Sequence, residues 1–267
     1  MELITHYDDV LYGIKTVRDF KEGYVTNFYP DKAQICLWIH LKIFFKLELT
    51  EGVVFFLKKN SDFCNFYFCS KSLESLENAI SIFHNSQHIK VSVDIIGSKQ
   101  MIHSIVNLMG YYDFKIIRKL TRMTRAASSF SEVADEHMTI ATKTHASEIE
   151  ILLYEYFDPY SEQLPLIQEI ESWIKNKRVI IYSENSKVIG FIIFDLFGAK
   201  SYLRYWFVHP EFRDRKIGSK LLRKFFKICE KSKKQVFWVV DDNVNAINKY
   251  EYYGFKAEPM HDYVLIN

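Results

Sequence analysis

The sequence predicts an α/β protein with a mixed sheet, organised as two domains. Short apolar runs that suit buried strands alternate with amphipathic stretches that suit helices, which is the pattern of an α/β fold. The length of 267 residues favours one large domain or two ordinary ones. The chain is 48% hydrophobic and 25% charged, so its composition is that of a globular protein able to build a sizeable core.

In the second half, hydrophobic spacing assigns the elements one by one. Leu166, Ile170 and Trp173 recur at helical spacing, and the apolar run from Gln235 to Val240 is typical of a buried strand. The polar segment 184–187 predicts a hairpin turn. The predicted elements are a strand at 138–141, a helix that starts at 144–147, a helix at 164–175, strands at 178–182, 188–196 and 202–208, a helix over 217–229, a strand at 235–240, a helix from Asn243 and a last strand at 263–266.

The first half repeats part of this order. The predicted elements are paired strands at 52–58 and 63–69, a helix at 73–83, a strand at 88–95, a helix at 99–109 and a strand at 115–123. Both halves close with a helix, a glycine among aromatic residues (Gly110 and Gly254) and a strand. We interpret this order as an internal duplication; two unrelated α/β units with a generic order are the alternative. A small, polar stretch predicts the boundary, so we expect domains at 1–125 and 137–267 with a linker at 126–136.

Charge and cysteine content exclude several classes of function. The net charge of +2 gives no reason to expect nucleic acid or a membrane surface as a partner. The four cysteines show no metal spacing and are expected to be buried free thiols in a reducing compartment. The nine histidines form no ligand set, so no metal is expected. Neither a secretory signal nor a run of about 18 apolar residues is visible, which favours a cytoplasmic protein.

A basic turn in the second half carries the first functional signal. Residues 210–219 read Pro-Glu-Phe-Arg-Asp-Arg-Lys-Ile-Gly-Ser, between a predicted strand and an amphipathic helix. The first N–H groups of a helix have no partner within it and lie at its positive dipole end, so such a turn suits a pyrophosphate. Gly218 allows an anion to approach the backbone. A solvated basic loop is the alternative.

A second predicted helix narrows the kind of domain to which the basic turn belongs. From Asn243 to Phe255 the sequence fits Asn-x-x-Ala-x-x-x-Tyr-x-x-x-Gly-Phe, which places Asn243, Ala246 and Tyr250 on one helical face. The turn and this helix together resemble the GCN5-related N-acetyltransferase (GNAT) superfamily, from about Thr139 to the C-terminus. The resemblance implies a GNAT fold at 137–267, preceded by a smaller GNAT-like α/β domain.

The same resemblance implies acetyl-CoA as the co-substrate. Its pyrophosphate would bind the backbone N–H groups of the turn, and its pantetheine arm would pair with a strand edge and contact Asn243. Tyr250 would protonate the leaving thiolate, a role that suits a hydroxyl beside a developing charge; an aromatic core residue is the alternative. The implied cofactor residues are Phe207, Val208, Arg213, Arg215, Lys216, Ile217, Gly218, Ser219, Asn243 and Tyr250.

Two departures from the family pattern qualify these expectations. The first turn glycine of the family falls on Lys216, which could add a phosphate contact or crowd the pyrophosphate; a helical backbone would tolerate the side chain. In the first half, Val106 stands where the second half has Tyr250, and the turn at 69–74 has no glycine. A GNAT-like first half would therefore be non-catalytic, serving as a structural partner, a wall of the acceptor pocket or a homodimer surface.

The sequence leaves the general base and the acceptor open. Glu155 and Asp158 follow the first helix of the domain, where this fold shapes the acceptor pocket, and are the candidate catalytic carboxylates; solvated loop acids are the alternative. Arg204 could meet an acidic acceptor or face water. The leading hypothesis is transfer of an acetyl group from acetyl-CoA to a primary amine of unidentified class, by direct attack in a ternary complex. A non-catalytic acyl-CoA-binding module and a structural dimerisation protein are the alternatives.

Overall fold

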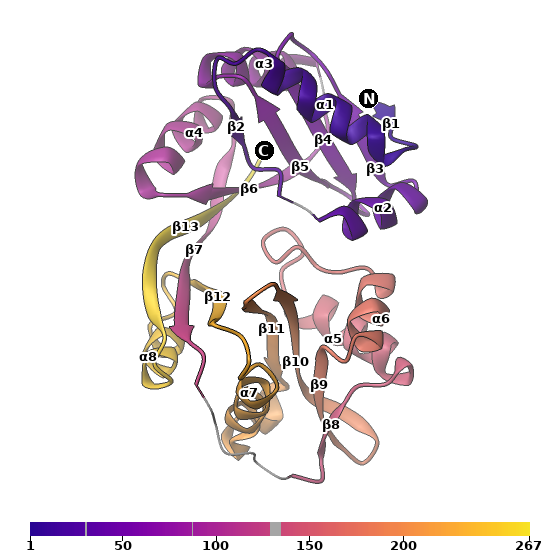
Figure 1. Cartoon of the computed structure of the whole chain (residues 1–267), viewed down its shortest axis with the longest axis vertical. Coiled ribbons are helices and arrows are strands. Elements are labelled where there is room, and N and C mark those ends of the chain that lie inside the picture. The colour runs from indigo at the N-terminus through magenta and orange to yellow at the C-terminus, as the bar shows by residue number, and fades with distance from the viewer. Residues whose placement is uncertain (30, 87, 129–134) are drawn as a thin grey trace. The chain divides into compact units, whose positions relative to one another are not determined.

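The protein forms two compact units (Figure 1). The structure is a computed structural model that describes residues 1–29, 31–86, 88–128 and 135–267. The first unit contains residues 1–120 and 259–267, and the second contains residues 121–258. Of the linker expected at 126–136, residues 129–134 lie outside the described residues.

The C-terminal segment does not follow the expected domain boundary. We expected residues 259–267 in the second domain, but they belong to the first unit. The last strand, β13 (Lys256–Ile266), pairs antiparallel with β6 (Val91–Gly97), from His261↔Gly97 to Ile266↔Ser92. It also begins seven residues earlier than expected. The partner of a strand is set by tertiary packing, which the local sequence pattern does not specify.

The first unit contains a mixed sheet with the strand order β1-β3-β4-β5-β6-β13. Its elements are β1 (Glu2–Leu3), α1 (Tyr7–Asp19), β2 (Val25–Thr26), α2 (Lys32–His40), β3 (Phe44–Leu47), β4 (Val53–Lys59), β5 (Cys64–Ser70), α3 (Leu73–Ser86), β6, α4 (Lys99–Tyr111) and the first part of β7 (Lys115–Ala126). The elements before residue 52 were not among those predicted, because their strands are very short and their helices carry weak local signals.

Helices cover both faces of this sheet (Figure 1). On one face, Phe55 of β4 belongs to a buried cluster with Phe83 of α3 and Met109 of α4. On the other face, a Cβ added at Gly13 of α1 would lie 3.4 Å from Phe56 Cζ. Because β4 is buried on both faces, its sequence Val-Val-Phe-Phe-Leu is continuously apolar rather than alternating.

The second unit contains the strand order β12-β11-β10-β9-β8. Its elements are β8 (Met138–Ile140), α5 (Ala146–Tyr156), α6 (Ile167–Lys175), β9 (Val179–Glu184), β10 (Lys187–Phe197), β11 (Lys200–Val208), α7 (Ile217–Ile228), β12 (Lys234–Val240), α8 (Val244–Tyr252), the ends of β7 and β13, and two short 3-10 helices, η1 (Lys143–His145) and η2 (Pro210–Arg215). Helices α5 and α6 cover one face of the sheet and α7 covers the other (Figure 1). The predicted helices and strands of this half are present, with shifts at their ends: α6 starts at Ile167 rather than at residue 164.

In each unit, one pair of parallel strands is paired only over its first few residues, and the two strands then diverge. β11 and β12 pair from Lys200↔Lys234 to Tyr202↔Val236, and the later residues of these described strands are not paired with each other. In the first unit, β5 and β6 pair only at Cys64↔Val91 and Asn65↔Ser92. In both units the second strand of this pair follows three successive strands, the last of which is its partner, and a crossover helix. The same element order and the same divergence therefore recur in the two halves, which is what an internal duplication predicts.

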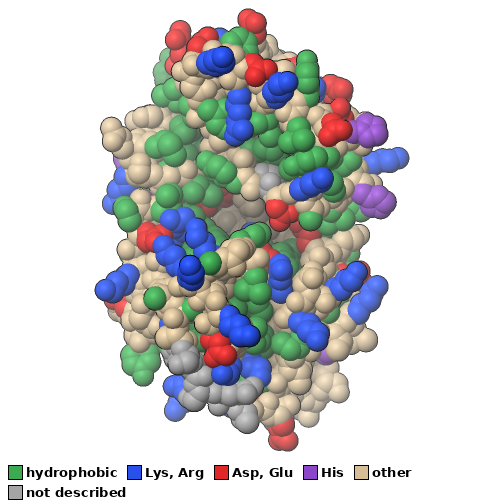
Figure 2. All heavy atoms as spheres, in the orientation of Figure 1, with side chains coloured by type: hydrophobic (Ala, Val, Ile, Leu, Met, Phe, Trp, Pro, Cys, Tyr) green, Lys and Arg blue, Asp and Glu red, His purple; other side chains and the backbone are tan. Residues whose placement is uncertain are grey.

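Surface features agree only in part with the composition. Cys64, Cys69 and Cys229 are buried free thiols, but Cys36 on α2 is exposed, so the expectation of a buried thiol is wrong there. On the face drawn in Figure 2, lysine and arginine side chains lie among acidic and apolar ones. Among the described residues, no helix is both long and apolar enough to span a membrane.

A buried acid ties the central strands of the second unit together. The side chain of Asp195 on β10 is 7% exposed. It accepts hydrogen bonds from Trp173 Nε1 (2.9 Å), Arg178 Nη1 (3.2 Å) and Arg204 Nε (2.7 Å). These donors come from α6, from the residue before β9 and from β11. The sequence left open whether Arg204 contacts an acidic acceptor substrate or faces water. In the structure it forms an internal ion pair with Asp195.

Replacing Asp195 with alanine should leave the three donors around it without their acceptor. We expect Asp195→Ala to lower the free energy of unfolding by about 2–4 kcal/mol, measured by urea denaturation. As a control, Glu230→Ala removes the more exposed pair with Lys227 (2.9 Å) on α7 and should change it by less than about 0.5 kcal/mol. Equal losses in the two variants would contradict the role given to Asp195.

Candidate active site

A cleft opens beside the last residues of β11 in the second unit, between the end of α5, the N-terminus of α7 and Lys249 of α8. We call it the β11 cleft; its volume of about 390 Å³ is typical of small-molecule sites. The residues that line it are Tyr156, Phe157, Trp206, Phe207, Val208, Arg213, Lys216, Gly218, Ser219 and Lys249. Six of the ten expected cofactor residues are in this set. The other four, Arg215, Ile217, Asn243 and Tyr250, do not line the cleft directly.

The N-terminus of α7 forms one wall of the β11 cleft. The first hydrogen bond within the helix runs from Lys220 N to Lys216 O (3.1 Å), so the N–H groups of residues 217–219 have no acceptor inside the helix. These groups and the positive dipole end are the features that bind phosphate. The side chain of Ile217 is fully buried in the core. Ile217 therefore offers a ligand its backbone N–H alone.

Lys216 has a left-handed backbone conformation, with φ of 59° and ψ of 14°. Glycine adopts this region without a Cβ penalty, which explains why the family pattern has glycine at this position. The structure therefore does not have the right-handed helical backbone that would tolerate a side chain at this position. The Lys216 side chain lines the β11 cleft, where it adds positive charge.

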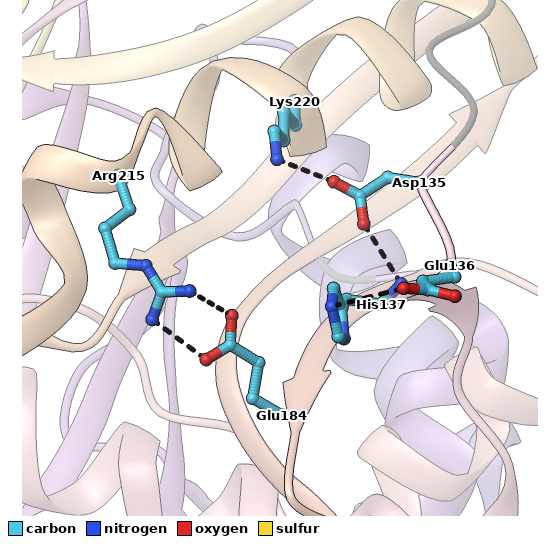
Figure 3. Close-up of polar contacts among 6 residues, drawn as sticks. All are labelled: Asp135, Glu136, His137, Glu184, Arg215 and Lys220. Atoms are coloured by element: carbon cyan, nitrogen blue, oxygen red, sulfur yellow. Dashed lines mark hydrogen bonds and ion pairs between the residues drawn. The ribbon is translucent and has the colours of Figure 1, made fainter.

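Acidic partners engage two cations near the turn (Figure 3). Arg215 forms a bidentate ion pair with Glu184 at the end of β9, with an Nη1···Oε2 distance of 2.8 Å. Lys220 pairs with Asp135 at 2.7 Å, and Asp135 also accepts from the backbone N–H of His137 (3.0 Å). Arg215 was expected to contact the cofactor, but its guanidinium is directed at Glu184. The cations that line the cleft are Arg213, Lys216 and Lys249.

Trp206 fills the space between β11 and α7. A Cβ added at Gly218 would lie 3.2 Å from Cζ2 of the indole, so the glycine admits the indole ring. The indole Nε1 is buried and has no hydrogen-bond partner in the described part of the chain. The ammonium of Lys249 lies 5.1 Å from the centre of the ring. A buried donor without an acceptor marks a place where a ligand oxygen would be stabilising.

Tyr250 packs between the two diverging strands. Its ring centre lies 5.6 Å from that of Trp206 on β11 and 4.2 Å from that of Phe237 on β12. Burial raises the pKa of Tyr250 to about 12. Tyr250 thus has the position of an aromatic core residue and also the protonated phenol that a general acid requires. The two hypotheses about its role are therefore compatible.

Asn243 caps helix α8. Its Oδ1 accepts a hydrogen bond from the backbone N–H of Ala246 (3.1 Å), which accounts for the Asn-x-x-Ala spacing as an N-cap. The amide oxygen is therefore committed to the helix. The amide NH₂ group is what this side chain can offer to a ligand.

The two candidate carboxylates differ in how they are held. Asp158 accepts from the backbone N–H of Tyr160 (2.9 Å) and from Ser161 Oγ (3.1 Å), so it stabilises its own loop. Glu155 is exposed on the last turn of α5. Desolvation and a hydrogen bond with Glu155 raise the pKa of the neighbouring Tyr156. Glu155 is thus the more accessible of the two acids.

Sequence reasoning missed a tyrosine–histidine pair beside the cleft. The hydroxyl of Tyr156 lies 3.0 Å from Nε2 of His209, and the Tyr156 ring packs against Phe207 with centres 5.0 Å apart. His209 Nδ1 lies 3.4 Å from the backbone nitrogen of Glu211 and 4.0 Å from its Oε2. The two partners are 53 positions apart, so no short motif marks the pair. The same holds for Trp206 and Lys249, which meet only in the fold.

These residues fit acetyl-CoA. Three cations and the N–H groups of α7 match its phosphates. In the chain as described, no group of three or more His, Cys, Asp or Glu side chains is arranged to hold a metal ion.

The conformation of Lys216 predicts different outcomes for two substitutions that remove the same charge. Lys216→Val should lower the free energy of unfolding by about 1–2 kcal/mol, because a β-branched residue is strained at positive φ. Lys216→Gly should not lower it, since glycine adopts this conformation readily. Thermal unfolding of the two variants measures the difference, and equal melting temperatures would contradict the left-handed assignment.

Several solved structures share the fold of the whole chain. A GCN5-related N-acetyltransferase from Sphaerobacter thermophilus has a TM-score of 0.60 at 12% identity, covering 97% of this chain and 91% of its own. A GNAT-family acetyltransferase from Colwellia psychrerythraea has a TM-score of 0.55 at 14% identity, with 99% and 98% covered. A tandem GNAT protein from the clavulanic acid biosynthesis pathway has a TM-score of 0.60 at 9% identity, with 100% and 97% covered. At these identities the likeness shows the fold alone.

The family comparison agrees with the structural one. Residues 146–255 match the model of the Acetyltransferase (GNAT) family, and this range lies within the second unit. No match was found among curated proteins. The resemblance predicted from the turn and the second helix is therefore confirmed for the C-terminal half, where residues 146–255 match the GNAT family model, and the fold of the whole chain is similar to that of a tandem GNAT protein.

Proposed function

We propose that the second unit is an N-acetyltransferase that moves an acetyl group from acetyl-CoA to a primary amine. The observation that carries the proposal is the convergence of two kinds of positively polarised group on the β11 cleft. These are the free N–H groups of α7 and three cations. The family match at residues 146–255 supports an acyl-CoA substrate.

In this proposal the two walls of the cleft bind different parts of acetyl-CoA. The N–H groups of residues 217–219 hold the pyrophosphate, with Arg213, Lys216 and Lys249 as the neighbouring positive charges. The edge of β11 at Phe207–Val208 pairs with the pantetheine arm.

Tyr250 is the proposed general acid. Acetyl-CoA, when bound, supplies a thioester whose carbonyl carbon is attacked by the amine nitrogen. Tyr250 gives its phenolic proton to the sulfur as the C–S bond breaks. Its raised pKa keeps that proton in place until the step, and a donor aimed at charge that develops only in the transition state accelerates the reaction.

Tyr156 and His209 are the proposed route for the proton that leaves the amine. Tyr156 lines the cleft, and its hydroxyl lies within hydrogen-bond distance of His209 Nε2. In the tautomer whose proton is on Nδ1, which lies 4.0 Å from Glu211 Oε2, Nε2 of the neutral imidazole is free to accept. The Tyr156 hydroxyl can then take a proton from the attacking nitrogen while passing its own to Nε2, so it ends as it began. Asp158 has no part in this route, because both its oxygens hold its own loop.

Replacing Tyr250 with phenylalanine should separate catalysis from binding. We expect kcat with acetyl-CoA and a primary amine to fall by about 100-fold or more, while the Kd for acetyl-CoA changes less than about threefold. Because the phenol keeps its proton up to its raised pKa of about 12, the wild type should show no loss of kcat from this group in the neutral and mildly alkaline range. An unchanged kcat in the variant would contradict the acid role.

The amine acceptor is found by assaying the wild type against a panel of primary amines. A non-catalytic acyl-CoA-binding protein is the second candidate function, because neither candidate carboxylate, Glu155 or Asp158, is among the residues that line the β11 cleft. Micromolar binding of acetyl-CoA by calorimetry without turnover across the panel would favour that candidate. Gly218→Trp, whose added ring has no room beside Trp206, is the control that should abolish binding.

Removing His209 should lower turnover rather than the binding of acetyl-CoA. We expect His209→Gln to lower kcat/KM by about 10- to 100-fold while the Kd for acetyl-CoA changes less than about threefold. Asp158→Asn is the matched control, for which we expect a change in kcat/KM below about threefold. A larger effect of Asp158→Asn than of His209→Gln would transfer the base role to the carboxylate.

A further inference from the structure

The cleft between β5 and β6 in the first unit is filled by the unit's own chain. Asn27, which follows β2 and is 7% exposed, lies between the diverging strands. Its Nδ2 donates to Phe66 O on β5 (3.0 Å) and to Asp94 O on β6 (3.1 Å). Its Oδ1 accepts from Phe68 N on β5 (2.7 Å). One planar side-chain amide thus bonds to both strands where their own pairing has stopped.

The residues before Asn27 continue along the edge of β5. Val25 and Thr26, which form β2, pair antiparallel with Ser70 and Cys69. The hydroxyl of Thr26 also donates to Phe68 O (2.7 Å). From Phe66 to the end of β5, the edge is therefore covered by main-chain and side-chain groups of residues 25–27.

The covered edge corresponds to the edge of β11 that faces the cofactor cleft. Counted from the last parallel pair, Ser70 in β5 stands at the same position as Phe207 in β11: each comes five residues later. Phe207 is the residue at which we place the pantetheine arm in the second unit. In the first unit, a pair of strand residues and an amide side chain occupy that position.

The first unit also lacks the features that would bind phosphate. Only two residues separate β5 from α3, whereas eight separate β11 from α7. The N-terminus of α3 is closed by Ser72, whose Oγ accepts from Ser75 N (3.0 Å). Lys71, the cation of this short turn, pairs with Glu22 at 3.3 Å. An anion would find neither a free helix N-terminus nor an unpaired positive charge in this turn.

We propose that the segment Tyr24–Phe28 is a built-in occupant of the first unit's pantetheine cleft. The first unit therefore does not take acyl-CoA, and the full chain binds one acetyl-CoA, in the second unit. The count of one rests on the proposed function of the second unit. The occupation of the β5 edge by residues 24–28 does not rest on that function, because it is a property of the first unit alone.

Amide hydrogen exchange of the full-length protein tests the occupant without any substitution. In the ligand-free protein, we expect the Phe68 amide to exchange at least about 100-fold more slowly than in an unfolded chain, because Asn27 accepts its proton. Adding acetyl-CoA should slow exchange along β11 and leave Phe68 unchanged. Fast exchange at Phe68 in the ligand-free protein, or slowing there on addition of acetyl-CoA, would overturn the proposal.

A pair of asparagine variants attributes that protection to Asn27. Asn27→Ala should speed exchange at Phe68 by about tenfold or more relative to Ile80 in the buried face of α3. Asn60→Ala removes a different side-chain bond, to Asn65 Oδ1 (3.0 Å), and should leave Phe68 unchanged. Equal exchange at Phe68 in the two variants would overturn the assignment. Where Asn27→Ala does not fold, the exchange of the wild type decides.

Calorimetry with acetyl-CoA completes the test. We expect one site per chain in the wild type and none in Gly218→Trp. Two sites in the wild type, or one remaining in the variant, would show that the first unit accepts the ligand and would overturn the proposal. No binding at all would remove the proposed function of the second unit, while exchange at Phe68 would still decide whether the first cleft is filled.

Discussion

The parallel pairs β11–β12 and β5–β6 stop after three and two residue pairs, and what each unit can do depends on how the freed strand edges are satisfied. A strand edge presents main-chain N–H and C=O groups that are costly to bury without partners. The first unit supplies partners from its own chain, through β2 and Asn27. The second unit leaves the edge lining a cleft of about 390 Å³. The difference between a filled and an open cleft thus arises from one shared feature of the fold.

Aromatic packing keeps the cleft of the second unit open. Tyr250 lies against Phe237 on β12 and against Trp206 on β11, so rings occupy the space into which the strands would otherwise close. The same packing places a protonated phenol beside the cleft and buries an indole N–H without a partner. Structural and chemical roles therefore rest on the same side chains, which is why a substitution at Tyr250 must be judged by binding and by turnover together.

The sequence predicted what short-range patterns encode. The elements of the second half followed from periodicity, and six residues of the cleft followed from the family resemblance that the turn and the second helix carry. The engagement of Arg215 by Glu184 did not, because that ion pair depends on where the β9–β10 hairpin lies in the fold. The left-handed backbone of Lys216 was not foreseen, since a lysine gives no signal for positive φ. Tyr156, His209 and Lys249 were missed for a related reason: nothing in the local sequence sets them apart.

The loop after each diverging strand explains why only one unit keeps an open edge. In the second unit, the eight residues between β11 and α7 form η2 and the left-handed Lys216, and they end at a helix whose first N–H groups are free. An open edge there lies beside the N–H groups that we propose bind phosphate, so one ligand would satisfy both together. In the first unit, the two-residue loop leaves a helix already capped by Ser72. An open edge beside it would carry the cost of unpaired main-chain groups with no phosphate site to offset that cost. The built-in segment removes that cost by pairing the main-chain groups. The short loop, which leaves no phosphate site, and the filled cleft therefore belong together.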